Sequence, residues 1–345
     1  MKVAIVGGSG YSAVELIRLL HNHPLVEIEA LISHSKNGSE FQTIYPHLTN
    51  LVELVLEELD VPNLSKKVEV VFFATPAGIS KELVPQFKEN GVKCIDLSGD
   101  FRLKSPEDYE TWYKQSAPEQ QYLNEAIYGL SEIYEEKIEN ASLIANPGCY
   151  PTATLLALLP VIKHGLVDTN SIIVDAKSGV SGAGRGLSLG AHYAEINENM
   201  KAYKLGSHQH IPEIEQVLGQ ENGEDITITF SSHLVPMSRG ILCTAYMKLT
   251  SDQTTEEIIQ LYKNFYESHP FVRIRPEGIL PSTKEVYGSN YCDLGFYVDQ
   301  RTGRLTIVSV IDNLVKGAAG QAIQNLNLMY GWDIQTGLTN VPIYP

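Results

Sequence analysis

Cys149 stands in a setting that suits a reactive thiol. The chain reads Asn-Pro-Gly-Cys-Tyr-Pro-Thr over residues 146–152, between a short apolar stretch and the helix-like residues 153–162. Because proline is favoured at the first position of a helix, we expect Pro151 to begin the helix and to leave Cys149 facing its unpaired N–H groups. The partial positive charge at that end favours a thiolate over a thiol. A glycine at position 148 would let a substrate approach the backbone closely.

The other three cysteines are predicted to be packing residues. Cys94, Cys243 and Cys292 lie in strand-like stretches, and an unpaired cysteine is most often buried as a small hydrophobe. Cys149 differs because its neighbours form turns. Four cysteines without close pairing give neither a disulfide framework nor a zinc pattern, which predicts a reducing compartment.

A glycine-rich turn follows the first strand-like stretch and opens a helix-like one. Residues 7–13 read Gly-Gly-Ser-Gly-Tyr-Ser-Ala. In the template Gly7-x-x-Gly10-x-x-Ala13, the first glycine makes the tight turn, the second lets the backbone contact a pyrophosphate, and alanine permits close helix packing. A plain glycine turn without a ligand is the alternative. We predict a dinucleotide site that includes Gly7, Gly8, Ser9, Gly10, Tyr11 and Ser12.

The end of the second strand-like stretch indicates which dinucleotide is bound. An acidic residue there would accept hydrogen bonds from the ribose of NAD, but the chain reads Ser-His-Ser-Lys at 33–36. Hydroxyls and a cation suit the 2'-phosphate of NADP, so Ser33, Ser35 and Lys36 are predicted contacts, with a solvated polar turn as the alternative. Turns elsewhere supply further candidate cofactor contacts, each also explicable by turn or capping chemistry: Thr75, Pro76, Ser181, Gly182 and Asn313.

A nucleophilic cysteine beside a nicotinamide implies attack on an activated acyl group or an aldehyde, with hydride transfer at the sulfur-bound carbon. This chemistry needs an acid/base, and the chain offers His208 and His210. If residues 211–218 form a helix, Glu213 could hold or charge the imidazole of His210. Two readings compete: surface histidines without function, and a metal site, although no third ligand stands at a recognisable spacing.

Arginines mark where an anionic substrate would bind. Arg102 follows a strand-like stretch, Arg185 ends a glycine-serine loop at 178–185 whose N–H groups could wrap an anion, and Arg239 lies in a third loop. The planar guanidinium matches phosphate and carboxylate, although each arginine could equally form a surface ion pair. Asn146, three residues before the cysteine, is the remaining candidate substrate contact.

The order of elements predicts an α/β fold in two domains. Residues 1–148 alternate strand-like and helix-like stretches, which indicates a Rossmann-type, doubly wound parallel sheet that binds NADP. In residues 149–312 the rhythm changes to longer strands with a hairpin turn at 299–303, which predicts an α+β catalytic domain with a mixed or antiparallel sheet. A last helix, within residues 313–345, has no strand after it and is expected to pack back on the first domain.

The composition of the chain limits the classes of molecule that it is expected to bind. The chain has 345 residues, 43% of them hydrophobic and 19% charged, which is ordinary for a globular protein. A formal net charge of -15 disfavours nucleic acid and acidic membrane surfaces but allows a cationic pocket for a small anion. No stretch is long and apolar enough to span a bilayer, and the start runs straight into a strand. A cytoplasmic protein is expected.

Taken together, these residues resemble the N-acetyl-γ-glutamyl-phosphate reductases, the arginine-biosynthesis members of the semialdehyde dehydrogenase group. The matching stretches follow one another over nearly the whole chain: residues 7–20, 96–103, 146–152, 178–185, 208–213, 235–240 and 312–320. Small departures occur at Gly8, Ala13 and Gly99, away from the proposed chemistry.

The resemblance implies an NADPH-dependent reduction of a small acyl phosphate, with Cys149 as the nucleophile, His210 as the acid/base and Glu213 as its carboxylate partner. The sister aspartate-semialdehyde dehydrogenases bind phosphate with an arginine in a similar setting, which makes Arg102 the phosphate candidate and leaves Arg185 and Arg239 for a substrate carboxylate or for architecture. A homo-oligomer is expected. The alternatives are aspartyl-phosphate reduction and a non-catalytic NADP-binding regulator whose cysteine is inert.

Overall fold

The computed structural model describes residues 1–344, and the chain forms two units. The first unit consists of Met1–Pro147 together with Ala318–Leu338. The second consists of Gly148–Gly317 and the segment that begins at Thr339. Within the described residues, no helix combines the length and the apolar character needed to cross a bilayer.

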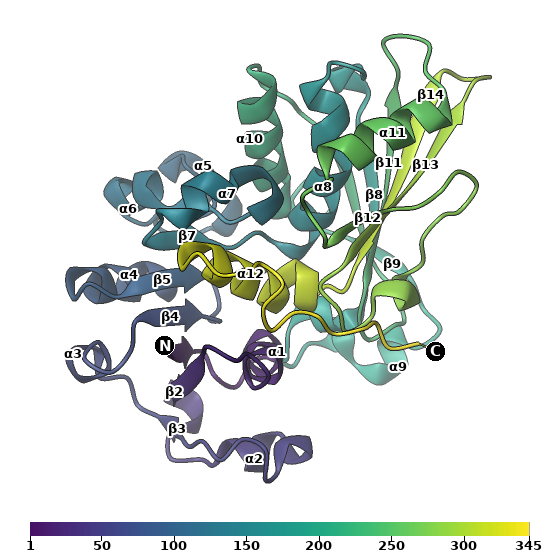
Figure 1. Ribbon diagram of the computed structural model, residues 1–345. Helices are drawn as coiled ribbons and strands as arrows, with labels where there is room; N and C mark the ends of the chain where they lie inside the picture. Colours follow the sequence, from purple (N-terminus) through teal and green to yellow (C-terminus); the bar gives the residue numbers. More distant parts are fainter. Residues whose placement is uncertain (345) are drawn as a thin grey trace. The chain divides into compact units, whose positions relative to one another are not determined.

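A seven-stranded parallel sheet forms the centre of the first unit (Figure 1). Its strands lie in the order β3-β2-β1-β4-β5-β7-β6. Their bounds are Lys2–Val6 (β1), Glu27–Ile32 (β2), Leu56–Glu57 (β3), Val70–Phe73 (β4), Lys93–Asp96 (β5), Ile127–Tyr128 (β6) and Leu143–Ala145 (β7). All four residues of β4 are buried, as expected for a parallel strand covered on both faces. The predicted doubly wound parallel sheet is therefore confirmed.

The helices of the first unit cover this sheet. One core cluster packs Val84 and Phe87 of α4 against Val71 and Phe73 of β4. The neighbouring residues of β4 point to the opposite face because side chains alternate along a strand. The bounds of the helices are Tyr11–Leu20 (α1), Phe41–Ile44 (α2), Val61–Leu64 (α3), Ser80–Glu89 (α4), Pro106–Tyr113 (α5), Gln120–Glu125 (α6), Ser131–Glu139 (α7) and Gly320–Met329 (α12).

The last helix, α12, packs on α7 and α1 and so belongs to the first unit. It is held by buried amides: Gln321 Nε2 donates to Gly129 O, and Asn325 Nδ2 donates to Gly129 O, each at 2.8 Å. The return to this unit begins at Ala318, five residues later than the sequence boundary of 313. The reason is that Asp312 and Asn313 are hydrogen-bonded to loops of the second unit. The segment from Thr339 also belongs to the second unit, where Ile343 N–H donates to Tyr287 O.

A seven-stranded mixed sheet forms the second unit, in the order β12-β13-β14-β11-β8-β10-β9. Its strands are Ile173–Ser178 (β8), Lys201–Tyr203 (β9), Thr229–Leu234 (β10), Ile241–Lys248 (β11), Val272–Ile274 (β12), Cys292–Asp299 (β13) and Arg304–Ile311 (β14). The pairs β8 with β10 and β12 with β13 are parallel, and the others are antiparallel. The antiparallel pair β13 and β14 confirms the predicted hairpin.

Three helices of the second unit stand beside this sheet (Figure 1). Helix α8 (Cys149–Lys163) packs on β11 and β14, α11 (Thr255–Phe265) packs on β13, and α10 (His210–Asn222) packs against α8. Along β11, buried and half-buried residues alternate, so the face with Cys243 and Ala245 is the one in the core. Cys149 is the first residue of α8 and His210 is the first residue of α10. Because these two helices pack against each other, both residues are held at the amino ends of packed helices.

Candidate active site

Cys149 is the first residue of α8, and Gly148 is its N-cap. The prediction that Pro151 begins the helix is wrong: Pro151 occupies the third helical position. Proline is tolerated there because the first N–H groups of a helix have no intrahelical acceptor, so nothing is lost. Cys149 is half-buried, whereas Cys94, Cys243 and Cys292 are buried, as predicted. Burial raises the pKa of the Cys243 thiol to about 12, which keeps it inert.

The peptide before the nucleophile is fixed on both sides. Gly148 N–H donates to Oε1 of Glu213 at 2.8 Å, and Gly148 O accepts hydrogen bonds from the backbone N–H and the hydroxyl of Thr152. Glu213 is 0% exposed. A carboxylate from α10 therefore orients the turn that presents Cys149, a role that the sequence did not indicate.

Gly317 lies directly against the nucleophile. A Cβ at this position would stand 2.8 Å from the Cβ of Cys149, which is closer than real side chains approach. Only glycine fits here, so the backbone at Gly317 lies beside the first residue of α8.

The two histidines are buried, so the reading as surface residues is wrong. His210 begins α10, one residue earlier than the predicted helix start at 211, and its N–H donates to Nδ1 of His208 at 3.1 Å. The rings lie 4.6 Å apart between centroids. The ring of Tyr150, which follows Cys149, stands edge-on to both, at 5.5 Å from His208 and 6.0 Å from His210.

Burial, together with the smaller effect of the Lys204 charge, lowers the pKa of His208 to about 4. His208 is therefore neutral near pH 7 and cannot carry a proton between substrate groups. Its Nδ1 instead accepts the first N–H of α10, which orients the helix that bears His210. Within residues 1–344 no group of three or more His, Cys, Asp or Glu side chains is arranged to hold a metal ion.

The glycine turn of the first unit has the shape that the sequence predicts. Gly7 has a φ of 91°, and a Cβ on it would stand 2.4 Å from Ala74 O, so no other residue fits. The N–H groups of Gly7 and Gly8 donate to Ile32 O. Gly10 is the N-cap of α1, and the helix begins at Tyr11. The turn thus leads directly into a helix amino terminus, which is suited to an anionic phosphate.

The remaining cofactor candidates of the first unit lie at strand ends. Ser33 is buried just after β2, whereas Ser35 and Lys36 are exposed in a short 3-10 helix, His34–Lys36. Thr75 and Pro76 lie in the loop between β4 and α4. Ligands bind at this carboxyl edge in parallel sheets of this type.

Asp100 anchors the loop between β4 and α4, and the sequence analysis missed this role. It is 0% exposed and accepts hydrogen bonds from the backbone N–H groups of Gly78 and Lys81 and from the hydroxyls of Ser80 and Tyr109. A buried carboxylate with this many donors is a structural anchor. Its place in the Asp-Phe-Arg stretch at 100–102 is its only signal in the sequence.

Arg102 is buried, and its guanidinium binds backbone carbonyls. Nε donates to Asn146 O at 2.8 Å and one terminal nitrogen donates to Leu97 O at 3.0 Å, which ties the ends of β5 and β7 together. Arg239 is paired with Asp312, at 3.6 Å, and Arg185 is exposed on its loop. The structure therefore gives Arg102 an architectural role beyond its predicted contact with phosphate.

Two asparagines predicted as ligand contacts bind protein groups. Asn146 Nδ2 donates to Ala318 O, and its Oδ1 accepts from Asn325. In the second unit, Asn313 Oδ1 accepts from Gly240 N–H at 2.7 Å, and its Nδ2 donates to the hydroxyl of Ser181 at 2.9 Å. Asn313 thereby joins the loop that carries Ser181 and Gly182 to the loop that carries Arg239.

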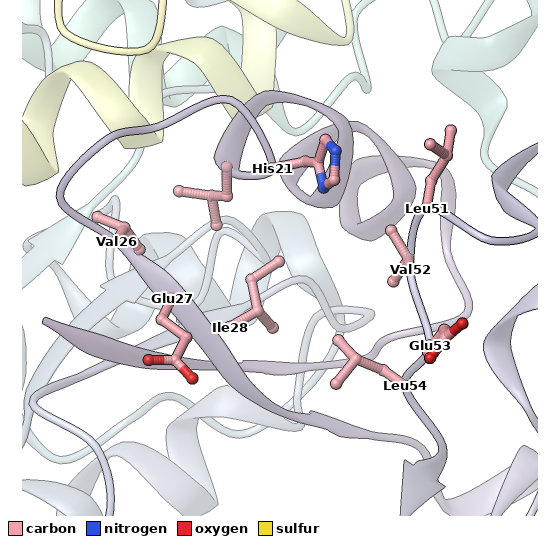
Figure 2. A pocket seen from close by; sticks show the side chains of 9 residues that line it. His21, Val26, Glu27, Ile28, Leu51, Val52, Glu53 and Leu54 are labelled. Carbon is pink, nitrogen blue, oxygen red and sulfur yellow. The ribbon is translucent and has the colours of Figure 1, made fainter.

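A shallow pocket on the first unit lies apart from these residues (Figure 2). It is formed at the carboxyl end of α1, whereas the glycine turn lies at the amino end of that helix. Its lining residues are Leu20, His21, Val26, Glu27, Ile28, Leu51, Val52, Glu53 and Leu54. None of them is a predicted site residue.

Comparison with known proteins gives the family. The chain is 55% identical over 345 residues to the N-acetyl-gamma-glutamyl-phosphate reductase of Geobacillus sp. (strain WCH70), and 56% identical over 345 residues to that of Brevibacillus brevis; each match covers 100% of both chains. The chain belongs to the N-acetyl-gamma-glutamyl-phosphate reductase family.

Family models and solved structures agree with this membership. Residues 2–141 match the semialdehyde dehydrogenase NAD binding domain, and residues 149–313 match the semialdehyde dehydrogenase dimerisation domain. The aspartate semialdehyde dehydrogenase of Candida albicans, solved with NADP, superposes with a TM-score of 0.71 at 16% identity, covering 96% of this chain and 99% of that chain. The reductase family thus shares its fold with the wider semialdehyde dehydrogenase group.

Proposed function

We propose that this chain reduces N-acetyl-L-glutamyl 5-phosphate to N-acetyl-L-glutamate 5-semialdehyde and phosphate with NADPH, a step of arginine biosynthesis. The observation that carries the proposal is the first turn of α8, where Cys149 opens the helix, Glu213 holds the preceding peptide, and Tyr150 packs against His210. Full-length identity of 55% to a reductase of this name supports the same substrate.

Cys149 acts as the nucleophile. His210 accepts the thiol proton, and the sulfur attacks the acyl carbon. A carbon–sulfur bond forms, the carbon–oxygen bond to phosphate breaks, and phosphate leaves with the electron pair, which gives a thioester on Cys149. NADPH, when bound, supplies the hydride that reduces the thioester carbon. His210 protonates the resulting oxygen and takes the proton back when the carbon–sulfur bond breaks, so the semialdehyde and the thiolate are released.

The electrostatics of His208 support His210 as the group that transfers protons. The pKa of His208, lowered to about 4, keeps that ring neutral, so it serves as a hydrogen-bond acceptor for the His210 N–H. Glu213, buried three residues after His210 on the same helix, supplies a negative charge that favours the imidazolium. The amino end of α8 favours the thiolate.

NADPH is the proposed cofactor of the first unit. The turn of Gly7, Gly8, Ser9, Gly10, Tyr11 and Ser12 is suited to the pyrophosphate because it leads into the amino terminus of α1. Exposed Ser35 and Lys36, together with Ser33, suit the 2'-phosphate, and no acidic residue stands among residues 33–36. Thr75, Pro76, Ser181, Gly182 and Asn313 remain predicted cofactor contacts, and Arg102, Asn146, Arg185 and Arg239 remain predicted substrate contacts.

We also infer that the chain forms a homo-oligomer, since residues 149–313 match a dimerisation domain. Among the described residues, none of the four cysteines forms a disulfide, which supports the predicted cytoplasmic location.

A direct assay tests the function. The purified chain is given N-acetyl-glutamate semialdehyde, phosphate and NADP, and formation of NADPH is followed by absorbance. Cys149→Ser should lower the rate by at least about 10³-fold, because a hydroxyl gives up its proton far less readily than a thiol and is the weaker nucleophile. Retained turnover in that variant would overturn the nucleophile. Turnover with aspartate semialdehyde in its place would favour the aspartyl-phosphate alternative. No turnover with either substrate, together with slow alkylation of Cys149, would favour the regulator.

A further inference from the structure

Tyr150 directly follows the nucleophile in α8 and takes no part in the proposed proton transfers. It is 2% exposed, and burial raises the pKa of its hydroxyl far above the usual value for a tyrosine. The phenol therefore stays protonated near neutral pH. Because a buried tyrosine hydroxyl needs hydrogen-bond partners, the contacts of this side chain indicate its role.

Three aromatic rings pack around His208, and we call them the cage. The rings of Tyr150, Tyr203 and Phe230 stand edge-on to the imidazole, with centroids 5.5, 5.6 and 5.7 Å away. They come from three different elements, α8, β9 and β10. The Tyr150 ring also stands edge-on to that of Phe230, at 5.4 Å, and His208 is 4% exposed. The cage thus keeps water away from the imidazole.

The charge of His208 decides whether this residue can hold α10. A neutral imidazole has one acceptor nitrogen, whereas an imidazolium has none. Because Nδ1 accepts the N–H of His210, at 3.1 Å, this bond exists only in the neutral ring that carries its proton on Nε2. The titratable groups around this ring are Lys204, whose charge also disfavours the imidazolium, together with His210, Tyr150 and Tyr203. Water in the cage would favour protonation and so remove the acceptor of the His210 N–H.

The hydroxyl of Tyr150 fixes its ring in the cage. It accepts a hydrogen bond from the hydroxyl of Tyr203 and donates one to His233 O, each at 3.2 Å. Both partners belong to strands, β9 and β10, that pair with each other. The side chain therefore connects the first turn of α8, where Cys149 lies, to the sheet and to His208.

We propose that Tyr150 is a positioning residue: its ring closes the cage, its hydroxyl fixes that ring, and the cage keeps His208 where it accepts the N–H of His210 at the start of α10. The geometry of the cage stands by itself. Its effect on the rate rests on the proposed function, because it is exerted through His210 as the acid/base.

The cage is tested first without substrate. Histidine ring nitrogens labelled with 15N report the tautomer and the protonation of each ring by NMR during a pH titration, and His208→Gln identifies the signal of His208. The wild-type ring should carry its proton on Nε2 alone down to about pH 4. Tyr150→Leu removes one ring of the cage and Phe230→Leu removes another. In both variants His208 should take up its second proton nearer pH 6.5, about the usual pKa of histidine.

Tyr266 offers a matched control in the same unit. It is 3% exposed, and its hydroxyl donates to Leu156 O of α8 at 2.8 Å, but its ring packs on other aromatic residues, namely Tyr262, Phe265 and His269. Tyr266→Leu should therefore leave the titration of His208 unchanged. A wild-type titration of His208 in both cage variants would overturn the proposal, and so would an equal shift in Tyr266→Leu.

The effect on the rate is tested with Tyr150→Phe, which keeps the ring and removes only the hydroxyl. This variant should lower kcat by about 5-fold with an unchanged KM for NADPH, whereas Tyr266→Phe should stay within about two-fold of wild type. In Tyr150→Leu the rate relative to wild type should fall further as pH is lowered from about 8 to about 6, because protonation of His208 releases the N–H of His210.

Two results would contradict this coupling. A kcat of Tyr150→Phe equal to that of the wild type would overturn the role of the hydroxyl, and a loss in Tyr150→Leu that does not vary with pH would overturn the link through His208 to His210. If the wild type has no turnover at all, the proposed function fails, and the histidine titration still decides whether the cage acts on His208.

Discussion

At the scale of single residues, Glu213 stands out because it joins two parts of the proposed chemistry. It lies on the helix that begins with His210, and its carboxylate accepts the N–H of Gly148, directly before Cys149. The charge of Glu213 and its hydrogen bond to Gly148 therefore contribute separately to the proposed reaction. Two substitutions at this position separate them, because glutamine keeps an oxygen acceptor and alanine does not.

We predict that Glu213→Gln lowers kcat by about 10-fold and that Glu213→Ala lowers it by a further 10-fold or more, since each tenfold corresponds to about 1.4 kcal/mol in the barrier. The further loss arises because the Gly148 N–H is left buried without an acceptor. Two measurements distinguish the loss of the charge from the loss of the hydrogen bond to Gly148: the steady-state rate as a function of pH, and the rate at which Cys149 is alkylated.

Glu215 offers a matched control on the same helix. Its Oε1 accepts the N–H of Ile228 at 2.9 Å, the same kind of bond away from the nucleophile. Glu215→Gln and Glu215→Ala should leave kcat within about two-fold of wild type. Equal losses in Glu213→Gln and Glu213→Ala would show that only the charge of Glu213 matters and that its bond to Gly148 does not.

The sequence predicts Cys149, His210 and Glu213 as candidate catalytic residues, because the chemistry of a thiol, an imidazole or a carboxylate follows from the residue type. The sequence does not show which groups these and other side chains bind by hydrogen bonds in the folded chain. Arg102 was nominated for phosphate, yet it binds backbone carbonyls of Leu97 and Asn146. The second of these acceptors is distant in sequence and has no side-chain signature, so only the folded chain reveals it.

At the scale of elements, the loop between β4 and α4 depends on Asp100. Four groups of this loop and its surroundings donate to one buried carboxylate, among them the N–H groups of Gly78 and Lys81. The loop carries Thr75 and Pro76, which are predicted cofactor contacts. Its shape should therefore control how well NADPH binds.

We predict that Asp100→Asn raises the KM for NADPH by about 10-fold with little change in kcat, the pattern expected when ground-state binding alone is weakened. In an amide one of the two oxygens is replaced by an NH2 donor. Both carboxylate oxygens lie within 2.9 Å of the Gly78 nitrogen, so in either orientation the new donor faces the Gly78 N–H. Tyr109→Phe is the control, because it removes one hydroxyl donor and keeps every bond to the loop backbone. An unchanged KM in Asp100→Asn would contradict the anchoring role.

Buried apolar strands were predictable even where they are short, as β7 is, whereas short strands with exposed or half-buried residues were not. The strands of the first unit are buried on both faces, so they stand out as apolar runs, as β4 does. Strands β3 and β6 have two residues each, and β9 and β12 have three, too few to show a period. Helix α12 was predicted from its apolar residues, but its buried amides follow from packing against α7 and Gly129.

At the scale of the whole molecule, the first unit ends at Pro147 and the second begins at Gly148. The sequence analysis places its domain boundary between residues 148 and 149. The return of the chain to the first unit was less visible in the sequence. Residues 312 and 313 look like a helix cap, and Asp312 does accept the N–H groups of Leu314 and Val315. The same two residues also hold loops at Gly288 and Gly240, which the sequence did not predict. Asp and Asn side chains can cap a helix or accept hydrogen bonds from distant backbone groups, so the sequence alone does not show which of the two roles such a residue has.

Each unit contains one buried histidine whose neutral form is favoured, and this makes stability depend on pH. Burial lowers the pKa of His208 to about 4, and burial also lowers the pKa of His23, against a smaller opposing effect of its hydrogen bond to Asn327. An unfolded histidine takes up its proton near pH 6.5, whereas the folded histidines take it up only at lower pH. The free energy of unfolding is therefore unaffected above pH 6.5 and falls as pH is lowered below it. For His208 the loss down to pH 4 is roughly 3 kcal/mol.

The two units allow each histidine to serve as the control for the other. Trp112 and Trp332 both belong to the first unit, and Trp332 packs on His23 at 5.6 Å, so tryptophan fluorescence during urea unfolding follows that unit. Hydrogen exchange of peptides from α10 and β10 follows the second unit. His208→Gln should flatten the pH dependence between pH 6.5 and 4 only in the exchange of the second unit, and His23→Gln only in the fluorescence of the first. If both variants keep the wild-type slope in both measurements, the buried neutral histidines are not the cause of the acid sensitivity.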